Sequence, residues 1–367
     1  MATVTKTIKS GGDYTSPAAW EADLDDTSIY SSGDTAIGEC SGDHELTSQL
    51  IINGGGTVGL TQTRLTAPAA DRHDGTAGTG TRLTFDMTSC KVFTMSYAGA
   101  DVQRTCEWIE FDFEETVRSG DEYLYLSNGG ESTGRLINFS HNLLHSLDAG
   151  SNLVRLIWAE TYCNAVHNNI VYDVTSTNST WVRGIVMYHR FSFCANNTVY
   201  HVRTTGTGAN ATGIWTRDSS ADDMFNNISV GTGGTSANDY VVSYHAQSGT
   251  KSNNLSSDST APGTDAVTGE SASDLFVSTS PGSEDLHLKS GAAAIGDGDD
   301  IGTSYSIPVH GGVTVASSAF GTAINYDIDD YNREDADAWD IGADQYVAAA
   351  TGGGTAPIVL ATTMAGL

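Results

Sequence analysis

A pair of residues that ends in asparagine recurs along the middle of the chain at nearly constant spacing. Four pairs are Asn-Asn and the first is His-Asn, and the intervals between their second members are 27, 28, 30 and 27 residues; those members are Asn142, Asn169, Asn197, Asn227 and Asn254. Self-similarity at a fixed period of about 20 to 50 residues is the mark of a repeat architecture. The chain is therefore expected to coil, with one pair at the same place in each coil.

Each pair precedes a short run of alternating polarity, as in residues 170–174 and 198–202. The pair is therefore predicted to be a turn that leads into a strand. Asparagine tolerates the left-handed backbone region better than most residues, and its side chain hydrogen-bonds nearby backbone groups. If one asparagine occupies the same corner of every coil, its amide lies about 4.8 Å from its neighbours and can donate along the stack.

A second strand precedes each corner and keeps the same register, because the similar segments at Gly184 and Gly213 lie 29 residues apart. Alternating polarity and abundant Gly, Ser, Thr and Asn exclude helical repeats of the ankyrin and tetratricopeptide types. A propeller needs four strands in about 40 residues, which these coils cannot supply. Coils of this length favour an all-β fold, a single-stranded right-handed parallel β-helix solenoid. The left-handed hexapeptide type needs a shorter coil.

These coils resemble the right-handed parallel β-helix of the pectin-lyase-like superfamily, of the kind found in phage virion-surface proteins. Residues 3–20 are similar to the strand, Gly-Gly-Asp-Tyr turn and capping helix that start many such chains. Near the other end, segments similar to the closing part of this group are residues 274–277, 285–288, 291–296 and 339–346. The resemblance covers residues 3 to 346 and implies the fold, but its motifs are not specific for an activity.

Four regions are expected. They are a strand with a capping helix (residues 1–30), the β-helix (31–258), C-terminal coils with closing loops (259–346), and a Gly-rich linker with an apolar tail (347–367). The capping helix should begin with Ser16 as N-cap and Pro17 at its first position, with Trp20 and Leu24 on one face. A cap is required because the first coil otherwise exposes unpaired strand edges and an apolar interior.

The chain is strongly acidic, with 17 Lys and Arg against 45 Asp and Glu and a formal charge of -28. Nucleic-acid binders need a basic footprint, and the sequence has no basic cluster, so no nucleic-acid partner is expected. The excess of carboxylates is typical of a highly soluble surface, with cation binding as the alternative.

The chain contains five cysteines without the spacing of a zinc site: Cys40, Cys90, Cys106, Cys163 and Cys194. Two of them, Cys106 and Cys194, stand two residues before the same corner position, which is Trp108 in one coil and Asn196 in the other. This placement predicts buried thiols stacked inside the helix, and disulfides are the alternative.

Three acidic segments raise the question of calcium. Within residues 108–114, alternation places Glu110, Asp112 and Glu114 on one face, which we interpret as solvated. A weak Ca²⁺ site is the alternative, because this ion needs several oxygens from more than one strand. Residues 297–300 and 327–330 have the composition of Ca²⁺ loops without EF-hand spacing, so turns are the preferred interpretation. No cofactor is expected, with Ca²⁺ as the alternative.

The two ends of the chain bear on location and partners. Residues 1–6 lack the apolar region of a secretory signal, which predicts a virion-surface protein made in the host cytoplasm, with an extracellular location as the alternative. The apolar tail is too short to span a bilayer, so no membrane span is expected. The tail should dock on this chain, on a symmetry mate or on another protein by strand addition, through Ile358, Val359, Leu360 and Met364.

The catalytic motifs of the pectin-degrading enzymes in the superfamily are absent from this sequence. Stacking the second strand in register aligns Glu160, His189 and Asp218 in a column, with the two carboxylates about 9.6 Å apart. That separation lies at the edge of the range for an inverting glycosidase, although a surface ion-pair ladder is the preferred interpretation. Tyr188 and Trp215 are candidates for stacking on sugars.

These patterns predict a structural or binding protein on the surface of a phage particle, such as a capsid decoration protein or a tail spike. A chain terminus would attach it to other virion proteins of the capsid or tail, and a homo-oligomer and a glycan ligand are compatible with this role. The alternative is a polysaccharide-degrading enzyme, a lyase or glycoside hydrolase acting on the outer face of the β-helix. That alternative rests on fold analogy alone and is not preferred.

Overall fold

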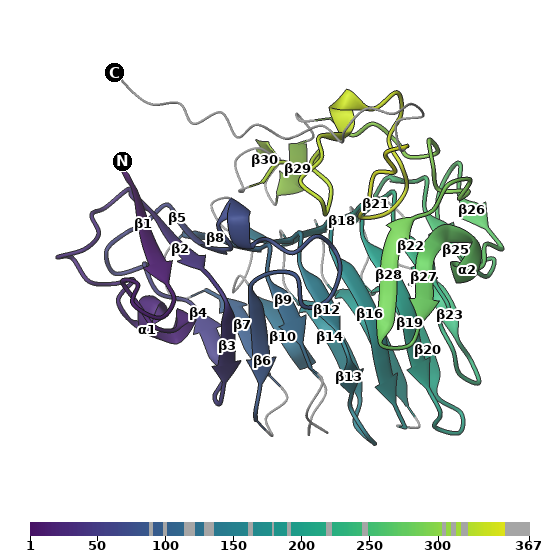
Figure 1. Ribbon diagram of the computed structural model, residues 1–367, viewed down its shortest axis with the longest axis horizontal. Coiled ribbons are helices and arrows are strands. Elements are labelled where there is room, and N and C mark those ends of the chain that lie inside the picture. Colours follow the sequence, from purple (N-terminus) through teal and green to yellow (C-terminus); the bar gives the residue numbers. More distant parts are fainter. Residues whose placement is uncertain are drawn as a thin grey trace, which may run out of the picture.

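The chain forms a parallel β-solenoid built from three sheets, here called A, B and C (Figure 1). The computed structural model describes residues 1–87, 91–97, 101–113, 122–127, 136–160, 164–177, 180–188, 192–217, 222–243, 249–302, 306–309, 313–316 and 322–348. Each coil passes through sheets A, B and C in turn, and each strand pairs in parallel with strands of the preceding and following coils. The predicted parallel β-helix is confirmed.

Sheet A has nine strands: β1 (Thr3–Ile8), β2 (Thr35–Cys40), β5 (Gln62–Thr66), β8 (Gln103–Glu107), β11 (Ile137–Ser140), β15 (Asn164–His167), β18 (Phe193–Ala195), β21 (Asp223–Phe225) and β24 (Lys251–Ser252). Sheet B consists of β3 (Asp43–Leu46), β6 (Arg82–Phe85), β9 (Glu110–Asp112), β12 (Leu143–His145), β13 (Leu147–Asp148), β16 (Ile170–Ser176), β19 (Thr198–Thr204), β22 (Ile228–Val230), β25 (Leu255–Ser256) and β26 (Val267–Thr268). Sheet C has seven strands: β4 (Leu50–Ile52), β7 (Phe93–Ser96), β10 (Glu122–Ser127), β14 (Val154–Ala159), β17 (Trp181–Met187), β20 (Asn210–Thr216) and β23 (Asn238–Val242).

The interior of the solenoid is filled by columns of similar side chains, because parallel register places equivalent residues of successive coils beside each other. In sheet C one such column is Leu124, Ile157, Ile185, Ile214 and Tyr240. In sheet A the column is Cys106, Phe139, Val166, Cys194 and Met224. Cys40, Cys106 and Cys194 are free and buried, which confirms the thiol prediction for these three, whereas Cys90 and Cys163 lie outside the described residues.

The asparagine pairs form the corner between sheets A and B. The first member of each pair has a positive φ of 51° to 53°, and Trp108 takes the same place one coil earlier with a φ of 60°. The second members form a continuous hydrogen-bond ladder, in which Nδ2 of each donates to Oδ1 of the next over 3.2, 3.0, 2.9 and 2.9 Å from Asn142 to Asn254. The predicted asparagine stack is confirmed.

The start of the solenoid is closed as predicted. Helix α1 (Pro17–Ala22) has Ser16 as its N-cap, and Ser16 Oγ accepts a hydrogen bond from the Ala19 N–H at 3.2 Å. Trp20 and Leu24 are fully buried, and Trp20 Nε1 donates to Tyr30 Oη at 3.2 Å. A Cβ on Gly38 would stand 2.8 Å from the Trp20 ring, so this glycine makes room for the cap.

Beyond β26 the described chain turns back over the solenoid. A short helix α2 (Ala272–Leu275) leads into the antiparallel hairpin of β27 (Phe276–Ser280) and β28 (Ser283–Leu288), which lies on the outer face of sheet B (Figure 1). Phe276, Leu286 and Leu288 pack there with Ile170 and Ile228. Coils were expected to continue through residues 259–346. Among the described residues, the last strand of the parallel stack is β26, at residues 267–268.

Residues 297–302 and 322–346, here called the return segment, run along the asparagine corner. Asn253 Nδ2 donates to the Asp297 carbonyl at 2.7 Å, and Asn226 Nδ2 donates to the Asp299 carbonyl at 2.9 Å. Asn168 Nδ2 donates to the Ile324 carbonyl at 3.0 Å, and Trp108 Nε1 donates to Thr322 Oγ1 at 2.9 Å. The first residue of each corner therefore supplies a donor to this segment. Within the return segment, residues Arg333–Asp335 form the 3₁₀ turn η3. The remaining described elements of the chain are β29 (Ser306–Val309), β30 (Val313–Ala316) and the 3₁₀ turn η1 (Ala69–Asp71).

Both aspartate-rich loops contain local hydrogen bonds, in which Asp300 Oδ1 accepts from the Gly302 N–H and Asp327 Oδ1 accepts from the Asp329 N–H. The preference for turns over Ca²⁺ at these loops stays a prediction. The solvated interpretation of the acidic stripe in β9 is wrong. Glu110 and Asp112 are 0% and 5% exposed, since a loop and the β27–β28 hairpin cover this part of sheet B, and Glu114 lies outside the described residues.

Because the asparagine amides bond to one another, replacing one of these asparagines should strongly destabilise the fold. Asn197→Ala should lower the free energy of unfolding by about 3 kcal/mol, because it removes buried hydrogen bonds to Asn169, Asn227 and the Val166 carbonyl and leaves the Asn169 backbone N–H without its acceptor. Urea titration followed by circular dichroism measures the loss. Asn196→Gly is the control. Glycine adopts a positive φ at little cost, so this variant should lose much less stability than Asn197→Ala. Equal losses in the two variants would contradict the role of the ladder.

The contact between the hairpin and the return segment predicts a loss of stability at alkaline pH. Burial alone would lower the pKa of His287, but Asp329, Asp344 and Asp285 outweigh it and raise the pKa to about 10. The folded state therefore holds this proton more tightly than the unfolded chain, and the stabilisation is complete below about pH 6.5 and lost as the pH rises through 10. The free energy of unfolding should fall by about 2 kcal/mol between pH 7 and pH 10. His287→Gln should reduce that fall, and an unchanged pH dependence would disprove the assignment.

Candidate glycan-binding face

A row of aromatic rings crosses four successive coils on the outer face of sheet C. It contains Tyr125 of β10, Trp158 of β14, Tyr188 directly after β17, and Trp215 of β20. The centroids of neighbouring rings lie 5.7, 5.5 and 6.3 Å apart along the row. The row lies on the outer side of the sheet because the intervening residues of these strands, such as Ile157, belong to the interior column, and within it Trp158 is 7% exposed.

Cationic side chains lie over these rings. Lys91 Nζ is 4.0 Å from the centroid of Tyr125. Three arginines lie over the other rings. The distance from Cζ to the ring centroid is 4.1 Å for Arg155 over Trp158, 3.9 Å for Arg183 over Trp215, and 4.3 Å for Arg217 over Tyr188. Each distance is within the range of a favourable cation–π interaction. A further ring, Trp181, is 38% exposed and lies 4.8 Å from Arg183.

We call this set the sheet C face: Lys91, Tyr125, Arg155, Trp158, Trp181, Arg183, Tyr188, Trp215 and Arg217. Its charge is opposite to that of the whole chain, which has 17 basic against 45 acidic residues. The pKa of Arg183 is lowered to about 10, first by burial and then by the nearby positive charges of Arg155 and Arg217. Arg183 therefore lies close enough to Arg155 and to Arg217 to be repelled by both, and the clustered cations make this face a local positive region.

The structure places some of the predicted site residues on this face. Glu160 lies at its edge and its carboxylate accepts a hydrogen bond from the Tyr125 hydroxyl. Tyr188 and Trp215, the predicted sugar-stacking residues, are neighbours in the row. The other two members of the predicted catalytic column, His189 and Asp218, lie outside the described residues. The same is true of the predicted docking residues of the tail, Ile358, Val359, Leu360 and Met364.

Sequence reasoning missed Tyr125, Trp158, Arg155 and Arg183, whereas the same register places Arg217 beside the predicted catalytic column. The signal was present, because Trp158 and Trp215 each directly follow the isoleucine of the interior column. Extending the register from the two glycines back to β14 and β10 would have placed these rings in one row. Arg155 and Arg183 could not be assigned in this way, since residues three positions apart in a strand do not normally share a face.

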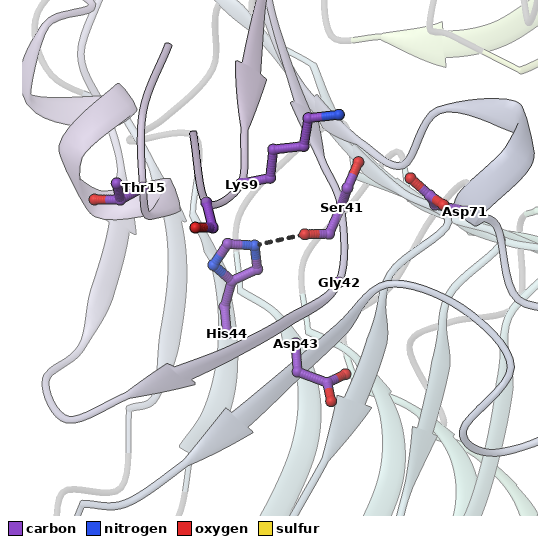
Figure 2. Close-up of a pocket in the computed structure, with 8 residues that line it drawn as sticks. Lys9, Thr15, Ser41, Gly42, Asp43, His44 and Asp71 are labelled. Atoms are coloured by element: carbon purple, nitrogen blue, oxygen red, sulfur yellow. Dashed lines mark hydrogen bonds between the residues drawn. The ribbon is translucent and has the colours of Figure 1, made fainter. Parts of the chain in front are cut away.

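A different depression lies near the N-terminal end of the solenoid, with a volume of about 580 Å³ (Figure 2). His44 Nε2 lies 3.2 Å from the backbone oxygen of Ser41, and Lys9, Thr15 and Asp71 point in different directions around it. These side chains do not converge on a common point. The sheet C face, with its regular spacing and its charge, is the stronger candidate for a binding site.

Comparison of the chain with protein-family models, curated proteins and solved structures gives no match in any of the three. No helix among the described residues is long and apolar enough to cross a membrane.

The cation–π row predicts a measurable contribution to stability. Arg183→Ala should lower the free energy of unfolding by about 1 kcal/mol, because the lost contacts with Trp215 and Trp181 outweigh the relief of repulsion from neighbouring arginines. Chemical denaturation followed by tryptophan fluorescence measures this change. Arg183→Lys keeps the positive charge and should lose less stability than Arg183→Ala. A stability gain in Arg183→Ala would show that repulsion dominates the row.

Proposed function

We propose that this protein is a glycan-binding β-solenoid that holds an extended acidic polysaccharide along the sheet C face. The observation that carries the proposal is the row of four aromatic rings interleaved with four cations, all on one face. Aromatic rings offer flat apolar surfaces to the faces of sugar rings, and guanidinium groups match carboxylates in geometry and charge.

The charge distribution supports an acidic rather than a neutral ligand. With a net charge of -28, most of the protein surface repels a polyanion, so the local positive region of sheet C is where such a chain can settle. Electrostatic complementarity of this kind guides encounter and suppresses binding in the wrong place. The binding role agrees with the prediction of a structural or binding protein.

Attachment to a phage particle remains a prediction from the sequence. It depends on the apolar tail, whose residues lie outside the described part of the chain. The alternative of a polysaccharide-degrading enzyme also remains, and Glu160 is the described residue that favours it. Because Glu160 is hydrogen-bonded to Tyr125 inside the binding row, the same face would hold the substrate of such an enzyme.

Binding should be measured against acidic and neutral polysaccharides, with polygalacturonate, alginate and hyaluronan compared with dextran and cellulose oligosaccharides. Biolayer interferometry should show binding to at least one acidic chain and weaker binding at high salt, because ionic contacts are screened. The double variant Arg183→Ala, Arg217→Ala should reduce affinity at least about tenfold, a loss of about 1.4 kcal/mol.

Arg203→Ala is the matched control, since Arg203 lies on sheet B and contacts His201. Its affinity should equal that of the wild type, and circular dichroism should confirm that each variant is folded. Equal binding by the double variant and the wild type would overturn the proposal. Release of reducing or unsaturated ends, abolished by Glu160→Gln, would establish the enzymatic alternative.

A further inference from the structure

A cleft of about 350 Å³ lies on the outer face of sheet B, on a different sheet from the proposed glycan-binding face. Its floor is formed by β9, β12 and β16, and its walls are residues 76–78 on one side and the tip of the β27–β28 hairpin on the other. The side chains that bear chemistry in it are Glu110, Asp112, His145, Tyr172, Asp173 and Glu284. It contains the two carboxylates of the acidic stripe.

Three potential metal ligands converge in this cleft from two neighbouring strands. One ligand atom from each of Glu110, Asp112 and His145 lies within 4.8 Å of the other two, and all three residues are buried. His145 Nε2 is 2.9 Å from Glu110 Oε1. Two ligands held at right angles about 2.1 Å from one ion are themselves about 3 Å apart, so this pair already has the spacing of adjacent ligands.

The second nitrogen of His145 is also held in a way that suits metal binding. Its Nδ1 is 2.9 Å from Ser146 Oγ, which accepts the proton when Nε2 binds an ion. Metal-binding histidines almost always donate their other ring N–H to such a partner, which fixes the tautomer and the orientation of the ring. The ring is further held by stacking on Tyr172, at 5.3 Å and an interplanar angle of 13°.

The charges around the cleft favour a cation. Glu110, Asp112, Asp173 and Glu284 face it with Arg82, while His145 and His201 pair with Glu110 and Asp173. Arg82 is shared between Asp112 and Asp43. Burial, and after it the neighbouring Asp173, raises the pKa of Glu284. A divalent cation would neutralise part of the negative charge of the four carboxylates.

We propose that Glu110, Asp112 and His145 form a binding site for a divalent first-row transition-metal ion. The mixed nitrogen and oxygen ligands suit Zn²⁺ or Mn²⁺ better than Ca²⁺, which prefers oxygen ligands alone. Arg82 and the Gly78 N–H already bind Asp112 and Glu110, so a bound ion would share these carboxylates with their present donors. The site is independent of the proposed glycan binding.

Isothermal titration of the wild-type protein, stripped with EDTA and desalted, tests the proposal with ZnCl₂ and separately with CaCl₂. One Zn²⁺ should bind per chain, and His145→Gln and Glu110→Gln should each weaken binding at least about tenfold, as expected for loss of a ligand. His287→Gln is the matched control, because His287 belongs to a second cluster with Asp329 and Asp344 and should leave the affinity unchanged.

A measurement on the wild type keeps the test independent of the folding of the variants. Addition of Zn²⁺ should shift the imidazole NMR signals of one of the ten histidines. The proposal is overturned by the absence of saturable Zn²⁺ binding or by unchanged Zn²⁺ affinity in His145→Gln. It is also overturned if only His287→Gln loses Zn²⁺ binding. Tight Ca²⁺ binding that survives His145→Gln would also overturn it, since that result requires a site made of oxygen atoms.

Discussion

The hydrogen-bond ladder of asparagine amides at the corner between sheets A and B is the interaction on which the solenoid depends. A tight corner leaves backbone donors and acceptors that neighbouring strands cannot satisfy, and each buried group left unpaired is costly. The second asparagine of each pair supplies both kinds of bond, to the backbone and to the next asparagine. Because each amide bonds to the next, the ladder holds the coils from Asn142 to Asn254 in register.

Fixed register has consequences on both sides of the sheets. Inside, it stacks aliphatic residues and thiols in columns, so a narrow core is filled without a large hydrophobic content. Outside, it aligns whatever each coil presents, and on sheet C this produces the row of rings and cations. A binding surface of this kind needs no loop to shape it, because the spacing between rings is set by the strand spacing of the sheet itself.

The sequence predicts the features that repeat or that depend on neighbouring residues. The asparagine period identified the coils and their ladder, and Ser16, Pro17 and Trp20 identified the cap. Features made by residues distant in sequence could not be predicted. Alternation in β9 correctly separated Glu110 and Asp112 from the interior, but nothing nearby shows that a hairpin more than 150 residues later covers them. The cleft on sheet B therefore follows from the structure alone, whereas half of the aromatic row on sheet C was found from the sequence.

The return segment changes how such a molecule can come apart. In most solenoids each coil touches only its neighbours, so the ends can fray while the middle stays folded. Here one stretch of chain is bonded to Asn253 near the last coil and to Trp108 several coils earlier. A coil between these two residues can open only after its hydrogen bonds to the return segment have broken. The β-helix should consequently resist stepwise unravelling and lose its structure in a single concerted event.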